Sequence, residues 1–217
     1  MAKSLLDVLV DKTAKLISDS LLGTNDIGKY GEKLTERELK WVKLLGRDGK
    51  ILRNVYLPKG EGSEETSEVD VIFITQKGIF VFESKNYSGW IFGNERDTLW
   101  TATLANGDRN KFYNPILQNK THIKWMREFV GDKIPLFSII VFSERCELKK
   151  ITMESMDVEV IQRDQTYATV RDIWDQNPDV LTKEEVTALY EKLYPLTQVS
   201  QEVKDKHVER IQEKYIK

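Results

Sequence analysis

The sequence is poor in cysteine and has no excess of charge of either sign, and both shortages exclude classes of protein. Its single cysteine, Cys146, permits no internal disulfide, which suits a reducing compartment and leads us to expect a cytoplasmic protein. With 33 Lys and Arg against 35 Asp and Glu, the formal net charge is -2. This excludes the strongly basic composition of a protein that coats nucleic acid, so any such binding depends on a local patch.

Long hydrophobic runs are also absent. Lysines and aspartates interrupt the leucines and isoleucines of residues 2–22, so this stretch cannot span a bilayer and lacks the core of a signal peptide. We expect no membrane association, and an amphipathic helix over residues 1–26 instead. One hydrophobic core is expected, in a domain over residues 27–177 followed by a helical extension over residues 178–217. The terminal helices would pack on the domain, on a partner, or on a second copy of the chain.

What the sequence does contain is a hairpin of two strongly hydrophobic strands. Residues 68–75 and 79–85 are runs of β-branched and aromatic residues separated by a short turn. Both faces of each strand are apolar, so we expect both faces to be covered. If a four-residue loop ends with Gly78 in a left-handed conformation, the register places Asp70 opposite Glu83, whereas a three-residue loop would break this pairing.

Two carboxylates that face each other on a sheet are unfavourable unless a cation lies between them. A metal ion would supply that charge, and oxygen ligands of this kind suit Mg²⁺ or Mn²⁺. Lys85 lies two residues after Glu83 and therefore on the same face of the strand. A Glu-x-Lys sequence is also common as a solvated ion pair that contributes little, so the residues alone leave both interpretations open.

The remaining chain is typical of a mixed α/β domain. Periodicity and helix boundaries predict helices over residues 29–45, 115–130, 169–174 and 184–193, with a mostly polar helix at the C-terminus. Further strands are expected over residues 51–57, 136–142 and 158–161. Short strands over residues 89–93 and 98–104 are expected to extend the sheet or cap its edge.

Polar residues on two of the predicted helices are candidates for the same site. Glu32 lies one turn into the first helix, where a solvated glutamate is the ordinary interpretation. Gln118 and His122 share one stripe of the helix that Asn114 is expected to cap. His122 fits a hydrogen-bonding border residue better than a metal ligand, because no histidine or cysteine accompanies it at ligand spacing.

Candidate nucleic-acid contacts are less specific. A phosphate-binding patch could come from four basic residues on or near the same helix, although a solvated helix face is the alternative: Lys111, Lys120, Lys124 and Arg127. Three aromatic residues could stack on bases of a single strand, although packing in the core or over an edge is the favoured interpretation: Tyr87, Trp90 and Trp100.

Taken in order, the motifs of this chain resemble those of the nuclease-related domain (NERD) family. They are G-x-x-G-E at residues 28–32, V-D-V-I-F-I-T at 69–75, G-I-F-V-F-E-S-K-N-Y-x-G at 78–89, Trp100, and N-P-x-x-Q-x-x-x-H at 114–122. That family looks like a branch of the PD-(D/E)xK, restriction-endonuclease-like superfamily. The resemblance implies an α/β fold, with a mixed α+β sheet flanked by helices in the order αβββαβ.

The resemblance also implies a metal-dependent nuclease that acts on DNA, with RNA not excluded. Metal ligands would be Asp70, Glu83 and the main-chain carbonyl of Ser84. Catalytic residues would be Glu32, Asp70, Glu83, Lys85 and Gln118, with His122 and Asn114 as accessory residues. The competing hypothesis is a non-catalytic module that keeps the fold and binds nucleic acid or a protein. The intact acid–acid–lysine set argues against it.

Overall fold

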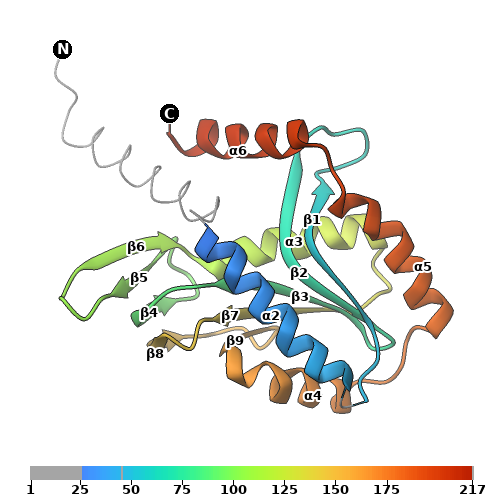
Figure 1. Ribbon diagram of the computed structural model, residues 1–217, viewed down its shortest axis with the longest axis horizontal. Coiled ribbons are helices and arrows are strands. Elements are labelled where there is room, and N and C mark those ends of the chain that lie inside the picture. The colour runs from blue at the N-terminus through green and yellow to red at the C-terminus, as the bar shows by residue number, and fades with distance from the viewer. Residues whose placement is uncertain (1–25, 45, 217) are drawn as a thin grey trace.

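The computed structural model describes residues 26–44 and 46–216, which form five α-helices and two mixed β-sheets (Figure 1). The helices are α2 (Asp26–Leu44), α3 (Pro115–Val130), α4 (Thr166–Gln176), α5 (Lys183–Leu193) and α6 (Gln201–Ile216). Each helix predicted within the described residues is confirmed. The helix expected over residues 1–26 lies outside them, apart from its last residue. No helix in the described part of the chain is both long and apolar enough to cross a membrane.

The first sheet has five strands in the order β1-β2-β3-β7-β9. They are β1 (Lys50–Pro58), β2 (Thr66–Thr75), β3 (Gly78–Lys85), β7 (Leu136–Phe142) and β9 (Val158–Gln162). Strands β1 to β3 are antiparallel neighbours, and β7 and β9 continue the sheet in parallel with β3. The hairpin register runs from Thr75 opposite Gly78 to Val71 opposite Phe82, as predicted, and Gly78 has a positive φ of 133°.

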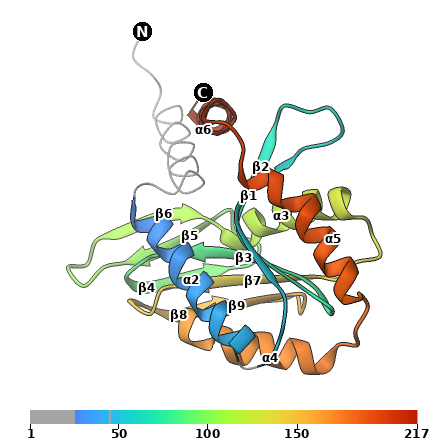
Figure 2. The same ribbon diagram turned by 45° about the vertical axis from the view of Figure 1, so that its right-hand side comes forward.

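Helices cover both faces of this sheet, which confirms the expectation drawn from its apolar strands (Figures 1 and 2). On one face Ile72 and Val81 pack in a cluster with Met126 of α3 and Val186 of α5. On the other face the buried residues are Val71, Phe73, Phe80, Phe82 and their neighbours, in contact with Leu39 of α2 and Val170 of α4. The domain boundaries expected from the sequence stay predictions.

The second sheet was not foreseen. Strands β4 (Gly89–Asn94), β5 (Leu99–Thr103), β6 (Arg109–Tyr113) and β8 (Cys146–Thr152) pair in the order β6-β5-β4-β8. The short strands were expected either to extend the first sheet or to cap its edge, and the first of these two outcomes is therefore wrong. They form a sheet of their own because β4 pairs in parallel with β8, and β5 and β6 close a hairpin beside it. Its apolar face packs on Ile140 and Phe142 of β7.

Strands β1 and β2 share an irregularity that decides where Asp70 lies. Their ladder is regular on either side but leaves out the facing pair Asn54 and Asp70. Asn54 has φ +51°, a left-handed conformation that is uncommon outside glycine. Strict alternation would place Leu52 and Val55 on opposite faces, yet both contact the same core cluster. The side-chain alternation thus reverses at this point.

Candidate active site

Asp70 lies where β2 and β3 separate. Their paired residues end with Val71 opposite Phe82, so the N–H of Ser84 loses the main-chain acceptor that a longer ladder would have supplied. The carboxylate of Asp70 replaces that acceptor, since its Oδ2 receives the Ser84 N–H at 2.7 Å. Where the two strands separate, a hydrogen bond to an acidic side chain therefore replaces a hydrogen bond between their main chains.

The carbonyl of Ser84 faces the same edge. On β3, Lys85 directs its carbonyl toward β7, where it accepts the N–H of Ser143 at 2.9 Å. Because successive carbonyls of a strand point to opposite edges, the Ser84 carbonyl points toward β2 and Asp70. Two hard oxygen donors, one carboxylate and one carbonyl, thus share one edge of β3.

Glu83 and Lys85 form a buried ion pair beside this edge. The Nζ of Lys85 lies 2.7 Å from Oε1 of Glu83 and donates at 2.9 Å to Oε1 of Gln118 on α3. Only 1% of Glu83 and 6% of Lys85 are exposed. His122, one turn further along α3, lies with Nε2 3.1 Å from Oε2 of Glu83, and its Nδ1 is 2.8 Å from Oγ of Ser67. Both carboxylate oxygens of Glu83 are therefore occupied.

The pKa values of the two central acids, Asp70 and Glu83, are shifted in opposite directions. Burial, and then the charges of Glu83 and Glu32, raise the pKa of Asp70 well above its usual range. Burial would also raise the pKa of Glu83, but Lys85 and His122 more than reverse this effect and hold it below its usual value. For Lys85, burial opposes the ammonium, yet Glu83 keeps its pKa raised. The pair is thus charged, whereas burial and the neighbouring carboxylates oppose ionisation of Asp70 more than Lys85 and the Ser84 N–H favour it.

Two further acids extend the cluster. Nδ2 of Asn54 donates hydrogen bonds to Glu32 at 3.0 Å and to Glu68 at 3.3 Å. The residue with the unusual backbone conformation therefore links α2 to β2. Tyr56 donates to Glu68 at 2.7 Å. Burial is the main cause that raises the pKa of Glu32 to about 7, with the charge of Glu68 adding to it. Four carboxylates thus interact around one region, where Lys85 acts on Asp70 and Glu83 and Arg53 acts on Glu32.

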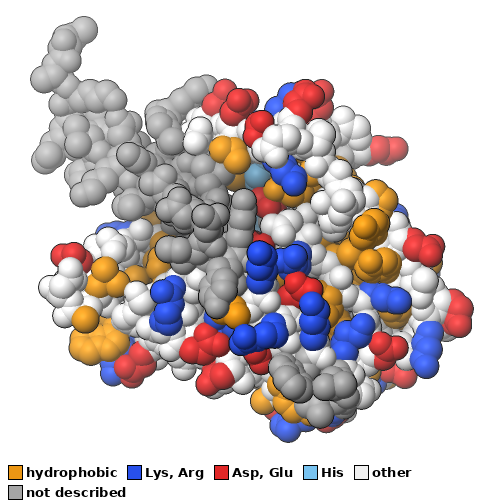
Figure 3. All heavy atoms as spheres, viewed as in Figure 1, with side chains coloured by type: hydrophobic (Ala, Val, Ile, Leu, Met, Phe, Trp, Pro, Cys, Tyr) orange, Lys and Arg blue, Asp and Glu red, His pale blue; other side chains and the backbone are white. Residues whose placement is uncertain are grey.

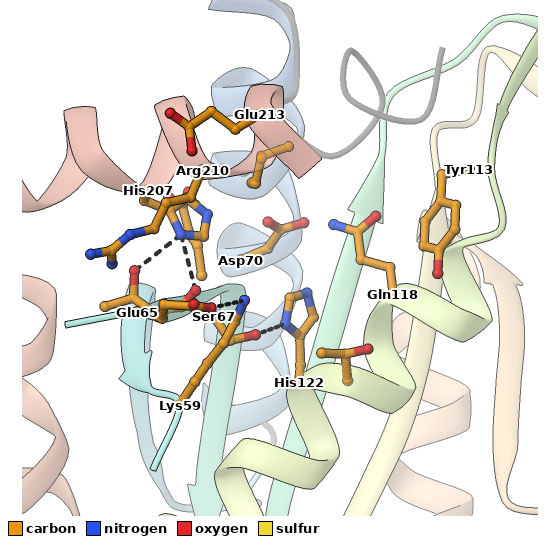
Figure 4. Close-up of a pocket in the computed structure, with 14 residues that line it drawn as sticks. Lys59, Glu65, Ser67, Asp70, Tyr113, Gln118, His122, His207, Arg210 and Glu213 are labelled. Atoms are coloured by element: carbon orange, nitrogen blue, oxygen red, sulfur yellow. Dashed lines mark hydrogen bonds and ion pairs between the residues drawn. The ribbon is translucent and has the colours of Figure 1, made fainter. Parts of the chain in front are cut away.

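A cavity of about 410 Å³ opens over these residues (Figure 4). Asp70, Gln118 and His122 line it from the sheet and from α3. The C-terminal helix α6 closes it from the other side with His207 and Arg210. The site is therefore a partly open pocket with Asp70 on one wall and, on α6, Arg210 together with the acid Glu213.

The family model of the nuclease-related domain matches residues 27–143. The chain belongs to the nuclease-related domain family. It is also similar to an uncharacterized protein of Bacillus anthracis, with 31% identity over 190 residues that make up 88% of this chain and 86% of that protein. No solved structure gives a significant match. The matched NERD region holds all of the acid, lysine and glutamine positions described above, whereas α6 lies beyond it.

Some residues predicted for the site lie elsewhere in the NERD fold. Asn114 caps α3 as expected, accepting the N–H of Ile116 at 2.9 Å, and its amide donates to the main-chain carbonyls of Glu95 and Asp97. It thereby ties the helix to the second sheet. The four basic residues expected to bind phosphate do not line the cavity: Lys111, Lys120, Lys124 and Arg127. Their role stays a prediction.

Other residues of the NERD pocket were not foreseen. Lys59 and Arg210 line the cavity, and His207 hydrogen-bonds Thr66 with Nδ1 3.0 Å from Oγ1. Arg210 is held by the carbonyl and the carboxylate of Glu64. No local signal marks these contacts, because they join segments about 140 residues apart through tertiary packing alone. In the part of the chain that is described, no group of three or more histidine, cysteine, aspartate or glutamate side chains has an arrangement that could hold a metal ion.

Proposed function

We propose that this NERD protein is a metal-dependent nuclease that hydrolyses phosphodiester bonds of DNA. The observation that supports it most is the convergence of Asp70, Glu83 and Lys85 beside a cavity that Asp70 lines. We also propose a restriction-endonuclease-like core. The order α2-β1-β2-β3-α3-β7 supports it, with β4 to β6 inserted before α3.

The donor set fits Mg²⁺ or Mn²⁺, which prefer carboxylate and carbonyl oxygens. Asp70, Glu83 and the carbonyl of Ser84 would hold the ion. A divalent cation would offset the burial and the repulsion from Glu83 and Glu32 that raise the pKa of Asp70. When bound, such an ion polarises a phosphodiester and lowers the pKa of a coordinated water.

The side chains around that position have separable tasks. An ammonium has three protons, and Lys85 gives two of them to Glu83 and Gln118, which leaves one for a water or a phosphate oxygen. His122, held by Ser67, fixes the orientation of Glu83. Glu32 would bind a bridging water or a second metal ion. Across the cavity, Arg210 supplies a positive charge for the phosphate backbone.

A second function is favoured by one specific observation. Both oxygens of Glu83 are engaged by Lys85 and His122, which is a stable arrangement without any metal ion. Under this second function, the chain is a non-catalytic module that binds nucleic acid or a protein through the same fold. Cleavage assays separate this alternative from the nuclease.

The test uses the full chain with labelled single-stranded and double-stranded DNA, and with RNA, in Mg²⁺, Mn²⁺ or EDTA. We expect cleavage of DNA that requires metal and falls roughly a hundredfold or more in Asp70→Asn and Lys85→Met. Asp172→Asn, at an exposed position on α4, is the matched control and should keep full activity. Absence of metal-dependent cleavage with every substrate, or equal activity in the two site variants, would overturn the proposal.

A further inference from the structure

The outer face of the second sheet carries aromatic and basic side chains in register. Trp90 pairs with Thr103, which pairs with Arg109. One step along, Phe92 pairs with Thr101, which pairs with Lys111. Because directly paired residues share a face, each row runs from an aromatic ring on β4, past a threonine on β5, to a cation on β6.

This face is open, whereas the opposite face is packed. Ile91, Trp100 and Phe112 point inward and are buried, while Trp90 is 51% and Phe92 37% exposed. Both rings line a surface hollow of about 310 Å³ together with Arg109 and the two threonines. Exposed hydrophobic side chains gather at this end of the molecule in Figure 3, with basic and acidic side chains beside them.

Charge is arranged around the rings as well as beside them. On the side opposite to β6, this aromatic platform of Trp90 and Phe92 is flanked by an ion pair. Nζ of Lys149 on β8 lies 5.2 Å from the ring centroid of Trp90 and 2.7 Å from Oε1 of Glu147, the residue of β8 that pairs with Trp90. Flat aromatic rings bordered by cations match a ligand that combines flat uncharged rings with regularly spaced anions. Single-stranded nucleic acid has this composition, whereas a duplex hides the faces of its bases.

The same face leads to the acidic cavity. Arg109, Lys111 and Tyr113 alternate along β6 and so lie on one side of the strand, and Tyr113 lines the cavity with Asp70. At about 3.3 Å per residue, the distance from Arg109 to Tyr113 is roughly 13 Å. A single nucleic-acid strand that is bound across Trp90 and Phe92 can therefore continue along β6 to the cavity that Asp70 lines.

We propose that the outer face of the second sheet binds single-stranded nucleic acid, with bases stacked on Trp90 and Phe92 and phosphates on Arg109 and Lys111. Binding by this face is independent of catalysis. Its use as a route for substrate rests on the proposed nuclease function, and deepens it by naming a single strand as the substrate class.

Fluorescence anisotropy tests the binding step with the full chain in EDTA, where no metal-dependent cleavage occurs. The probes are a labelled oligothymidine of about 20 nucleotides and a duplex of the same length. We expect Trp90→Ala and Phe92→Ala each to weaken single-strand binding roughly tenfold, because stacking on an aromatic ring contributes at this level. Arg109→Ala and Lys111→Ala should each reduce the salt dependence by about 0.7 in the log–log slope.

Matched controls are Tyr194→Ala, which removes an aromatic ring that is 45% exposed on the short 3-10 helix η2 (Tyr194–Thr197), and Lys133→Ala. Unchanged single-strand affinity in the Trp90 and Phe92 variants would overturn the proposal. So would an equal loss of duplex binding, or a dimer seen by light scattering that Trp90→Ala dissociates. Single-strand binding by this face without any nuclease activity would refute only the proposed function. Metal-dependent cleavage that Trp90→Ala and Phe92→Ala leave unchanged would refute only the use of this face as a route for substrate.

Discussion

The carboxylate of Asp70 accepts the main-chain N–H of Ser84 at 2.7 Å, at the point where the ladder between β2 and β3 stops. One side chain therefore has two tasks. It completes the hydrogen bonding of a strand end, and when ionised it adds a negative charge to an acidic cluster whose burial and charges raise its pKa. The first task needs only an oxygen acceptor, whereas the second needs the charge.

Asparagine at position 70 should separate these tasks. Asp70→Asn keeps an acceptor for Ser84 and removes the repulsion with Glu83 and Glu32, so we expect a variant about 1–2 kcal/mol more stable than the wild type. Asp70→Ala loses the acceptor as well and should be less stable than Asp70→Asn. Urea denaturation compares the three proteins, and equal destabilisation by both substitutions would contradict this interpretation.

The buried pair of Glu83 and Lys85 makes a prediction for a double-mutant cycle. Lys85→Met leaves a buried carboxylate with only His122 as a partner, and should cost roughly 3–5 kcal/mol of unfolding free energy. Adding Glu83→Gln removes the orphaned charge and should recover most of that loss. The measurement is urea unfolding of both single variants and the double variant. If the losses simply add, the two groups are not coupled as the distance indicates.

Glu95 makes the stability of the second sheet depend on pH. Its carboxylate accepts the Ser155 hydroxyl and the N–H groups of Ser155 and Glu154, and these hydrogen bonds lower its pKa to about 2. A group whose folded pKa is depressed stabilises the protein above its unfolded pKa of about 4.5 and loses that contribution as pH falls toward 2. Glu95→Gln should therefore melt a few degrees lower than the wild type above pH 5.

The difference in melting temperature between Glu95→Gln and the wild type should shrink as the pH falls from about 4.5 toward 2, because the wild-type carboxyl then takes up a proton. Thermal unfolding followed by circular dichroism over that range gives the comparison. Glu128→Gln, at an exposed position on α3, serves as the control and should show no such trend. A constant difference between Glu95→Gln and the wild type at every pH would contradict the assignment.

Much of the first sheet could be predicted because its determinants are local. The turn at Gly78 and the apolar runs on either side were enough to give the register from Thr75 opposite Gly78 to Val71 opposite Phe82, although the ladder stops one residue before the predicted pair of Asp70 and Glu83. Gln118 and His122 share one stripe of α3 as predicted, but this stripe is buried and contacts Lys85 and Glu83 of the sheet, whereas a half-buried border was the ordinary expectation. His122 is a hydrogen-bonding partner of Glu83, in line with the interpretation favoured from the sequence.

The rest depends on contacts between distant segments. Strand β8 carries charged residues at three of its seven positions, two of them adjacent, so it lacks the alternation that predicts a strand; pairing with β4 and packing of its apolar residues on the core stabilise it. The reversal at Asn54 has no sequence signal either, because asparagine adopts positive φ in many turns. Arg210 reaches the pocket only because α6 crosses above it, which periodicity within that helix does not reveal.

Arg210 provides a kinetic prediction that rests on the proposed nuclease function. It lines the cavity opposite the acids, so Arg210→Ala should raise KM for DNA severalfold and leave kcat nearly unchanged. Lys206→Ala removes a basic residue from the same helix that does not line the cavity, and should have little effect. Steady-state kinetics decides the point. A fall in kcat alone, or equal effects of both substitutions, would contradict a role in binding phosphate.

The most direct test of the central claim is calorimetric titration of Mn²⁺ into the wild-type chain and into Asp70→Asn, since it examines the site without the need for a substrate. We expect saturable binding to the wild type that is lost in Asp70→Asn and retained in the control Asp172→Asn. No binding to the wild type, with or without nucleic acid, or equal binding to Asp70→Asn, would contradict a metal-dependent centre at Asp70 and Glu83.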